Sequence, residues 1–287
     1  MSAEVELARL ERQVLGIARV SRFVDAVDLL RRMLATETPG IRERVLRLVA
    51  PSIGRDLAAA VASAWNLGVL DAVRTIDGPE PKGIPAGPPK AIVKAASAAE
   101  KAIADELKKA RKLARAGAAD AAVLAPVSAA RNTLERSVTS LVKRAGNAGT
   151  TAVADRAGLS TVWVAETNAC VTCLAYSGRV AKPGKTFPAG LTYGRRSTVS
   201  ERIDYPPAHP HCRCTVEPLN APEYADALRR EADRSVLRGF SLESESMATR
   251  IDAASRLLDR GVEAPKSVKA YAAAAVKRGE FTTRGRP

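Results

Sequence analysis

The sequence reads TNACVTC at residues 167–173 and PPAHPHCRC at residues 206–214. These two stretches hold all four cysteines and both histidines of the chain. Inert core thiols would be scattered along a sequence, so the gathering of every soft ligand into one short segment indicates a shared metal site. We expect this site to organise the fold around it.

The ligand spacing fits a single tetrahedral Zn²⁺ ion. A CxxC turn places two thiolates close enough to share one ion, and the spacing from His209 to Cys212 does the same for an imidazole and a third thiolate. Cys170, Cys173, His209 and Cys212 therefore make a complete closed shell, which predicts a structural zinc site.

The fourth ligand position has competitors. In an extended chain Cys214 points to the same side as Cys212, so Cys214 can replace His209. His211 can substitute in the same way. The sequence leaves the fourth position open among His209, His211 and Cys214.

Other uses of the cysteines are disfavoured. A thioredoxin-like redox pair needs its CxxC at the N-terminus of a helix in a βαβ context, whereas here the strand-like run Val162-Trp163-Val164 leads into a polar turn. Structural disulfides belong to oxidising compartments. A catalytic zinc ion keeps one coordination position open and needs a nearby acid or base, whereas this cluster supplies enough thiolates to close the shell.

The sequence predicts neither secretion nor a membrane span. Residues 1–20 alternate acids, arginines and aliphatic residues without an apolar signal core. The longest uncharged apolar stretch, Leu57 to Leu70, is too short to cross a bilayer. We therefore expect a soluble protein without a membrane partner, made in a reducing cytoplasm, where thiolate–metal bonds are favoured over disulfides.

Positive charge is the second strong signal. The formal net charge is +14. Residues 90–144 carry twelve Lys or Arg against five Asp or Glu, a net charge of +7, and residues 266–287 carry six against one, a net charge of +5. Counterion release makes a phosphate backbone the natural partner of such a surface. Because residues 90–144 contain no aromatic side chain for base stacking, we expect DNA contact that is independent of sequence and sensitive to salt.

The N-terminal region, residues 1–76, has helical periodicity and predicts a bundle of helices. The pattern is broken at Thr38-Pro39-Gly40 and again at Pro51, with Ser52 as a candidate N-cap of the next helix. Five prolines and three glycines in residues 77–89 then predict a linker.

Residues 90–149 predict a basic, Ala-rich helical arm of two amphipathic segments that ends at Gly146 to Gly149. Small residues permit close approach of helices, so we expect a hairpin or an arm packed on another subunit. The first segment carries a narrow stripe of apolar residues: Ile92, Ala95, Ala99, Ile103, Leu107, Ala110 and Ala114.

The candidate ligands lie in a β- and loop-rich module at residues 150–218. Val162-Trp163-Val164 predicts a strand and Cys214-Thr215-Val216 its pairing partner, with the ligand turns at the strand ends. Residues 182–201 are rich in Gly, Pro, Ser and Arg and predict a mobile surface loop. Five aromatic residues are expected to pack with the zinc ion: Trp163, Tyr176, Phe187, Tyr193 and Tyr205.

Helical patterns resume in the C-terminal region, residues 219–287, and the chain closes with a frayed basic tail. The three expected helices cover residues 224–240, 246–260 and 266–278. Together these patterns predict an α+β fold that is mostly α-helical, with a small zinc-bound module between helical regions.

The combination of Trp163, the CxxC at 170–173, Ser177-Gly178 and the PPxHPxCRC at 206–214 resembles the signature of the phage Mu F-like, or head-morphogenesis, minor capsid proteins. The resemblance covers roughly residues 150 to 218. Three positions depart from the family pattern: Asn168 replaces an acidic residue, Ser177-Gly178 replaces Asp-Gly, and His211 replaces a polar residue such as Asn. None of these changes removes a proposed ligand.

The resemblance implies a structural protein of a tailed bacteriophage, made in the host bacterial cytoplasm. Such a protein is incorporated at few copies inside the head near the portal and aids assembly and DNA packaging or ejection. The implied partners are the portal protein or the major capsid protein, together with packaged phage DNA bound non-specifically. This agrees with the positive charge, because packaged DNA is the neighbour of an interior head protein.

Two other classes compete with a non-enzymatic head protein. The first is a phage-encoded enzyme, either a capsid-maturation protease or an ADP-ribosyltransferase. A serine protease needs a free histidine base, but both histidines lie in the metal motif, and Glu243-Ser244-Glu245 is interpreted as a solvated helix face. The second is a free zinc-ribbon protein that binds nucleic acid.

Overall fold

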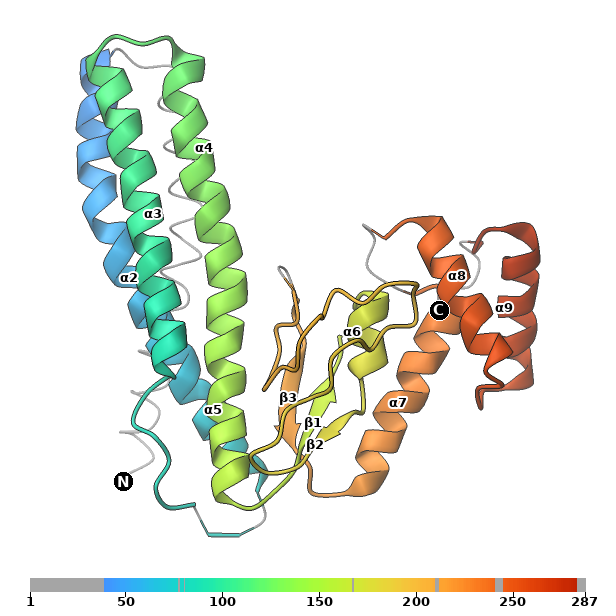
Figure 1. Ribbon diagram of the computed structural model, residues 1–287. Helices are drawn as coiled ribbons and strands as arrows, with labels where there is room; N and C mark the ends of the chain where they lie inside the picture. The colour runs from blue at the N-terminus through green and yellow to red at the C-terminus, as the bar shows by residue number, and fades with distance from the viewer. Residues whose placement is uncertain are drawn as a thin grey trace. The chain divides into compact units, whose positions relative to one another are not determined.

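The structure, a computed structural model, describes residues 39–76, 78–79, 81–166, 168–209, 212–240 and 245–282. This part of the chain is mostly helical and holds a small three-stranded antiparallel sheet, which confirms the expected α+β, mostly α-helical class (Figure 1). The expected helices before Thr38 lie outside the described residues, as do His211, Glu243, Ser244 and the end of the basic tail.

A succession of helices is interrupted by three short strands. The helices are α2 (Pro39–Thr75), α3 (Lys90–Arg115), α4 (Asp120–Ser137), α5 (Lys143–Arg156), α6 (Val171–Tyr176), α7 (Pro222–Leu237), α8 (Met247–Asp259) and α9 (Lys266–Arg278). A short π-helix, η1 (Val138–Val142), joins α4 to α5. The strands are β1 (Thr161–Val164), β2 (Val180–Ala181) and β3 (Thr215–Pro218).

The chain forms two compact units. The helical unit comprises the described residues up to Leu70 together with Pro85–Gly149, and the C-terminal unit comprises Asp71–Ile84 and the described residues from Thr150 onward. The boundary falls within α2 and within α5. The finer division into five segments stays a prediction.

In the helical unit, α3 and α4 pack against each other as a hairpin (Figure 1). Gly117, with φ of 70°, lies in the short connection, where its left-handed backbone reverses the chain without a Cβ clash. The hairpin core consists of small and branched residues: Ile103, Leu107, Ala110, Ala114, Val123, Val127, Ala130 and Leu134. The hairpin alternative for the Ala-rich segments is thus confirmed, although Ala96 is buried on α3 where Ala95 was expected and Ala95 is exposed.

The helix break expected at Pro51 is wrong, because α2 continues from Pro39 to Thr75 without interruption. A proline inside a helix removes one hydrogen bond and costs about 3 kcal/mol or more. In a helix of 37 residues the remaining hydrogen bonds offset this local loss. Pro126 is accommodated inside α4 in the same way.

The end expected at Gly146 to Gly149 is also wrong, since these residues lie inside α5. They mark a close approach between helices. A Cβ on Gly68 of α2 would collide with the backbone carbonyl of Gly146, and a Cβ on Gly149 would lie 2.5 Å from the carbonyl oxygen of Trp65. Glycine therefore brings the backbones of α2 and α5 into direct contact.

Replacing Gly149 by alanine is expected to lower the stability of the helical unit by about 1–3 kcal/mol, as overpacked sites do. The added methyl group would meet two backbone groups, Trp65 O at 2.5 Å and Val69 N at 3.1 Å, and neither can rotate away. Gly87→Ala is the matched control, because no atom lies within 4 Å of its added Cβ. Urea denaturation followed by circular dichroism measures both variants, and equal midpoints would contradict the close contact.

The sheet of the C-terminal unit has the order β2-β1-β3, and both pairings are antiparallel. Trp163 on β1 lies opposite Val216 on β3, which confirms the expected pairing of these two runs. Trp163 is fully buried, with its ring centroid 4.8 Å from that of Tyr176 and 5.3 Å from that of Phe187. The central strand thus places the indole at the middle of the module's aromatic core.

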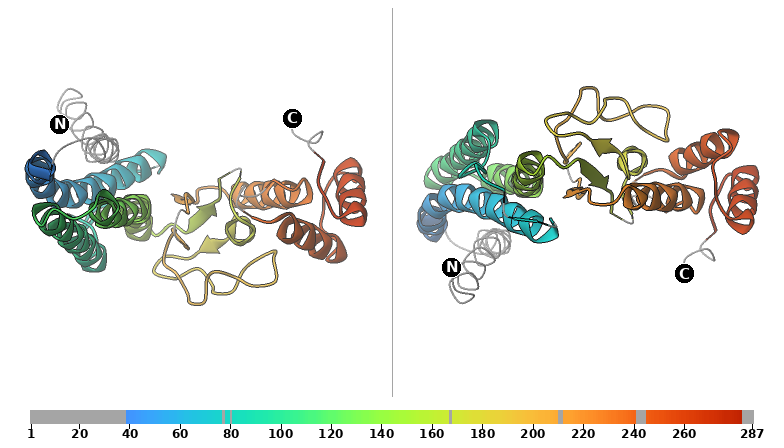
Figure 2. Two further views of the ribbon diagram at one scale, coloured as in Figure 1. Left: turned by 90° about the horizontal axis from the view of Figure 1, so that it is seen from above. Right: turned by 90° about the horizontal axis from the view of Figure 1, so that it is seen from below.

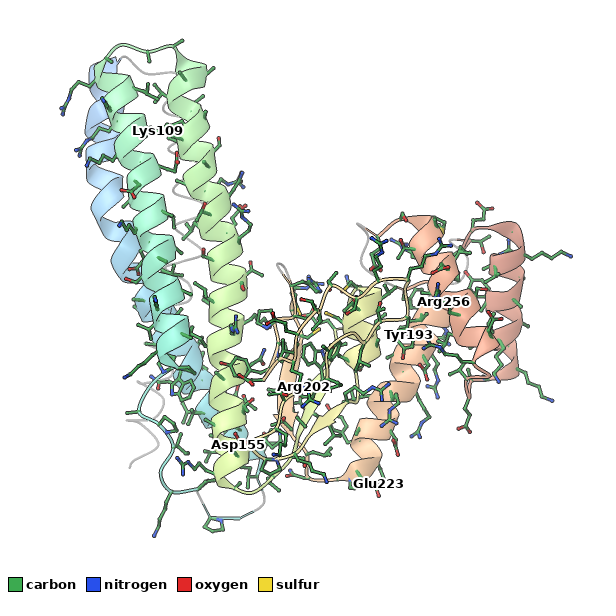
Figure 3. The ribbon with its side chains drawn as sticks, viewed as in Figure 1. Lys109, Asp155, Tyr193, Arg202, Glu223 and Arg256 are labelled. Atoms are coloured by element: carbon green, nitrogen blue, oxygen red, sulfur yellow. The ribbon has the colours of Figure 1, made fainter. Side chains whose placement is uncertain are left out.

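The segment 182–201 is irregular, as expected, but it is not a free surface loop. Phe187, Tyr193 and Val199 are buried, and Phe187 forms an isolated bridge with Ile203. The hydroxyl of Tyr193, labelled in Figure 3, donates a 2.6 Å hydrogen bond to Asp233 on α7. The composition of this segment predicted a surface loop, because Gly, Pro and Arg outnumber the apolar residues. The few apolar residues nevertheless hold the segment against the module.

The last three helices confirm the expected C-terminal helical region and pack together (Figure 2). Pro222 occupies the first turn of α7, and the side chain of Ser246 caps α8 by accepting from Thr249 N at 3.2 Å. Residues from α7, α8 and α9 share one core with Val171 and Leu174 of α6. Within the described residues, every helix is too short or too polar to span a membrane.

Candidate metal centre

The first pair of cysteines lies at the start of α6. Cys170 is the N-cap residue, and its Sγ accepts a hydrogen bond of 3.4 Å from the backbone N–H of Cys173. The interpretation of this CxxC as part of a polar turn is therefore wrong. A Cys side chain can take the place of the usual capping oxygen, which periodicity in so short a helix does not reveal.

The second ligand group lies in the segment that leads into β3. The backbone N–H of Cys212 donates to the carbonyl of His209 at 3.1 Å, which closes a tight turn between them. Cys214 directly precedes β3, so the pairing of β3 with β1 holds Cys214 beneath the sheet, where it is buried. The two halves of the motif thus meet because of the strand pairing.

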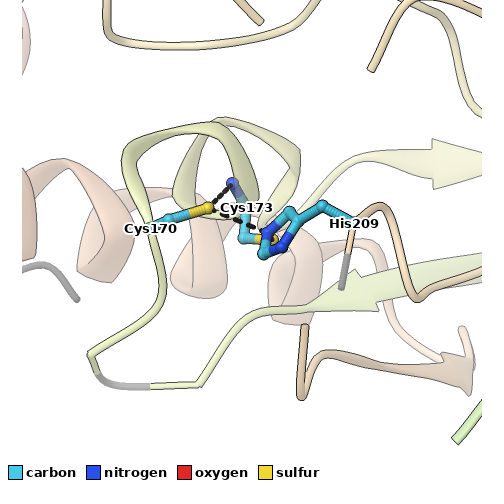
Figure 4. A group of neighbouring side chains, drawn as sticks. All are labelled: Cys170, Cys173 and His209. Carbon is cyan, nitrogen blue, oxygen red and sulfur yellow. Dashed lines mark hydrogen bonds between the residues drawn. The ribbon is translucent and has the colours of Figure 1, made fainter. Parts of the chain in front are cut away.

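All five candidate ligands converge around Cys173. His209 Nε2 lies 3.1 Å from the Sγ atoms of both Cys170 and Cys173 (Figure 4). The Sγ atoms of Cys173 and Cys212 are 3.5 Å apart. The ligand atoms form two overlapping groups, each with all members within 4.8 Å of one another: Cys170, Cys173 and His209, and Cys173, Cys212 and Cys214.

The donor set fits a metal ion. Around Zn²⁺, with Zn–S bonds of about 2.3 Å, a tetrahedron has S···S edges of about 3.8 Å and slightly shorter S···N edges. The separations of 3.1–3.5 Å among Cys170, Cys173, His209 and Cys212 are close to these edges, and Cys173 belongs to both groups of three ligand atoms. Four thiols and one imidazole can therefore hold a metal ion, and all four thiols are free of disulfides.

Trp163 supplies a further sign of a charged group at this site. Its indole Nε1–H is buried and has no hydrogen-bond partner of normal geometry among the described residues. It is nevertheless close enough to Cys214 to lower the pKa of that thiol. An N–H donor directed at a metal-bound thiolate is a common outer-shell arrangement, and it would satisfy this otherwise costly buried group.

The pKa values of the four thiols are shifted in opposite directions. Hydrogen bonding from Cys173 and, less strongly, from His209 lowers the pKa of Cys170 to about 4 against the opposing effect of burial. Hydrogen bonds from Cys173 and Cys214 lower the pKa of Cys212 to about 2. The pKa of Cys173 is raised by its hydrogen bonds to Cys170, Cys212 and Cys214 and by burial. The hydrogen bond with Cys173 lowers the pKa of Cys214, but the one with Cys212 and burial outweigh it.

The position of the CxxC at a helix start is compatible with redox chemistry as well as with metal binding. The solvent accessibility of the thiols distinguishes between these two roles. A reactive dithiol has an accessible attacking sulfur. Here Cys170 is 9% exposed and Cys173 is 1% exposed, and both contact an imidazole. The third and fourth thiols of the cluster are buried as well. This environment favours ligation over thiol–disulfide exchange.

A cleft of about 760 Å³ opens beside the Cys170–His209 edge of the cluster. Its other walls include the charged residues Arg195, Arg196 and Glu245. His209 is only half-buried, whereas Cys173, Cys212 and Cys214 are buried. A small chelator can therefore approach a bound ion from this side.

Glu245 was interpreted as part of a solvated helix face, and this is wrong. It precedes α8, and its carboxylate oxygens accept from the backbone N–H of Val171 at 3.1 and 3.3 Å. Val171 is the first residue of α6 and follows Cys170, so Glu245 holds the start of the CxxC helix from a distant part of the chain. Sequence spacing gives no signal for a contact between residues so far apart.

Replacing Glu245 by glutamine is expected to destabilise the C-terminal unit by about 1–3 kcal/mol, because a hydrogen bond to a charged group becomes a weaker neutral one. Glu231→Gln is the control, since Glu231 forms an exposed pair with Arg234 and should change stability by less than about 0.5 kcal/mol. Thermal unfolding and competition with a zinc chelator measure the two variants. Indistinguishable curves would exclude the anchoring role.

Arg213, between the last two cysteines, connects the two motif halves at the surface. Its guanidinium lies 2.8 Å from the carboxylate of Glu166 and donates to Oδ1 of Asn168 at 2.7 Å. The acidic partner of Arg213 is Glu166, and Asn168 provides a neutral acceptor beside it. The sequence motif did not identify Glu166, because Glu166 lies two positions before Asn168 in the sequence.

The structure thus brings together five of the six ligand candidates from the sequence, namely Cys170, Cys173, His209, Cys212 and Cys214, while the sixth, His211, lies outside the described residues. Comparison of this chain with protein-family models, with curated proteins and with solved structures found no significant match to any of them.

Proposed function

We propose that this protein is a minor capsid, or head-morphogenesis, protein of a tailed bacteriophage, in which a structural zinc ion holds the module of residues 150–218 together. The observation that carries the proposal is the convergence around Cys173 of ligands from both halves of the motif that resembles the Mu F-like signature. Two short, loop-rich segments far apart in sequence are joined there by one cluster.

Zinc is the metal that this donor set favours. Thiolates with an imidazole suit Zn²⁺ in a tetrahedral site. Five candidate ligands exceed the four positions of that site, which supports a closed structural role over an open catalytic one. His209, His211 and Cys214 remain the candidates for the fourth position beside Cys170, Cys173 and Cys212.

The helices and the positive charge carry the assembly role in this proposal. The partners are the portal protein or the major capsid protein, and packaged DNA contacted without sequence preference. The net charge of +14 supports the DNA contact, because a phosphate backbone releases counterions when basic residues approach it. The protein acts as a structural component and not as an enzyme, at several copies in the interior of each virion.

Purification of phage particles from a producing lysate tests this function. We expect the protein to co-sediment with mature particles and with isolated portal oligomers at several copies per particle, as counted by quantitative mass spectrometry. Absence from particles, with the protein found free or on nucleic acid in the host cytoplasm, would favour the zinc-ribbon regulator. If phage that lack this protein no longer process their capsid proteins, the protease alternative would be favoured.

A further inference from the structure

One face of α3 carries a row of basic side chains. At about 100° per residue, six basic residues of α3 fall within about 40° of a single line along the helix. We call them the α3 basic stripe: Lys90, Lys94, Lys101, Lys108, Lys112 and Arg115. All six are exposed. Lys109, labelled in Figure 3, is exposed beside the stripe.

The stripe faces away from the hairpin core. The buried residues of α3, among them Ile103, Leu107 and Ala110, lie on the opposite side of the helix, where they pack against α4. Burial of that face fixes the rotation of α3 about its own axis. The basic side chains are therefore held in a straight array by a packed helix.

Among its own residues, α3 carries few acidic side chains near the stripe. Asp105 is the acidic residue of α3 on the same sector, whereas Glu100 is turned aside and accepts from the backbone N–H of Ala58 on α2 at 3.1 Å. The ion pairs among described residues include no lysine of the stripe. The charge of these lysines is thus available to an external polyanion.

The stripe has the composition of a phosphate-binding surface. Lysine is depleted at protein–protein interfaces, which favour aromatic residues, Met and Arg. The exposed neighbours on α3 are mostly small, among them Ala91, Ser97 and Ala98, and the larger exposed Val93 lies near one end of the stripe, so its middle offers a protein partner little apolar anchorage. Lysines bind phosphate as point charges, and the lack of aromatic side chains disfavours single strands, which bind by stacking.

We propose that the α3 basic stripe binds the phosphate backbone of duplex DNA, without reading its sequence. The stripe spans about 37 Å along the helix axis, which equals about 11 base pairs of B-form DNA. This inference deepens the proposed DNA contact by naming its surface. It depends only on the helical unit and requires neither the bound metal nor a particular viral partner.

The number of contacts sets the salt dependence. Each phosphate neutralised contributes about −0.9 to the slope of log K against log salt concentration, so six contacts predict a slope of about −5. Replacing Lys94, Lys101 and Lys108 together by glutamine should reduce this slope to about −3. The same change should weaken binding at 0.1 M salt by on the order of tenfold or more.

Fluorescence anisotropy with a labelled 20-base-pair duplex tests the proposal on the full-length protein. The control variant K182Q/K185Q/K277Q removes the same charge from exposed lysines of the C-terminal unit and should keep most of the affinity and slope. The variant K94R/K101R/K108R keeps the charge and should preserve binding. Circular dichroism checks that the helices of each variant are intact, which glutamine favours as a good helix former.

Equal weakening in the stripe and control variants would overturn the proposal, because net charge alone would then explain binding. Equal or tighter binding of polyglutamate or of anionic lipid vesicles would overturn it in favour of an acidic protein or a membrane. The result of this DNA-binding measurement is independent of the result of the particle experiment. A protein found in virions with a stripe that does not bind DNA would refute this inference while leaving the proposed function in place.

Discussion

Replacing Cys173 by serine is expected to abolish metal binding and to unfold most of the C-terminal unit. Cys173 is the residue common to both ligand groups, is 1% exposed, and its Sγ contacts both His209 and Cys212. Structural zinc sites contribute about 10–16 kcal/mol of apparent binding free energy in small zinc domains. This equals or exceeds the usual total stability of a domain, about 5–15 kcal/mol.

Zinc content per chain, measured by plasma mass spectrometry, should fall from about one to about zero in this variant. Near-ultraviolet circular dichroism should lose the signal of the buried aromatic residues. Thr172→Ala is the matched control: Thr172 is buried between the two cysteines, its hydroxyl bonds to Thr192, and its loss should leave the zinc ion bound. One tightly bound zinc ion in Cys173→Ser would contradict the assignment.

The same measurement identifies the fourth ligand. His209→Ala and Cys214→Ala remove the two described candidates for that position. The variant that lacks the true fourth ligand is expected to lose zinc at concentrations of chelator that leave the wild type loaded. The other variant is expected to change zinc affinity far less. Retention of zinc by both variants would point to His211.

Replacing Trp163 by alanine is the second large expected effect, a loss of about 3–5 kcal/mol in the free energy of unfolding. The indole is fully buried on the central strand and packs on Tyr176 and Phe187 at centroid distances of 4.8 and 5.3 Å. Tyr176 is in turn held by a 2.6 Å hydrogen bond from its hydroxyl to the carbonyl of Pro188. A cavity at Trp163 would remove packing from every side of this aromatic cluster.

Chemical denaturation of the zinc-loaded protein measures this effect. Tyr224→Ala is the control, because Tyr224 is 39% exposed and its loss should have a much smaller effect. Trp163→Phe separates two roles: it keeps most of the packing but removes the N–H near Cys214, so zinc affinity should fall more than stability does. A Trp163→Ala variant as stable as Tyr224→Ala would show that the aromatic core does not stabilise the module.

Much of the candidate site could be predicted from local sequence. The pairing of β1 with β3 follows from two short apolar runs with β-branched and aromatic residues, and the ligand types follow from the crowding of cysteine and histidine. The α3–α4 hairpin follows from apolar residues repeated every three or four positions. In each case the signal is contained in neighbouring residues of one segment.

Other features depended on residues that are distant in sequence. The glycines of α5 look like a helix end, but their lack of a Cβ is used for contact with α2. Residues 182–201 look like a surface loop, yet Phe187 and Tyr193 bury themselves in the module. The start of α6 depends on Cys170 as its cap and on Glu245 from the segment before α8.

The amino-acid order was enough to establish which residues can bind a metal ion, that the chain is mostly helical and where positive charge accumulates, because these properties reside in single side chains and in short-range periodicity. The folded chain was needed to establish that the five ligands surround Cys173, that Glu245 and Glu166 support them, and that the lysines of α3 form one straight exposed line. These outcomes depend on strand pairing and on the burial of one helix face. Both arise from the packing of distant segments, which lowers the free energy only when the whole core assembles.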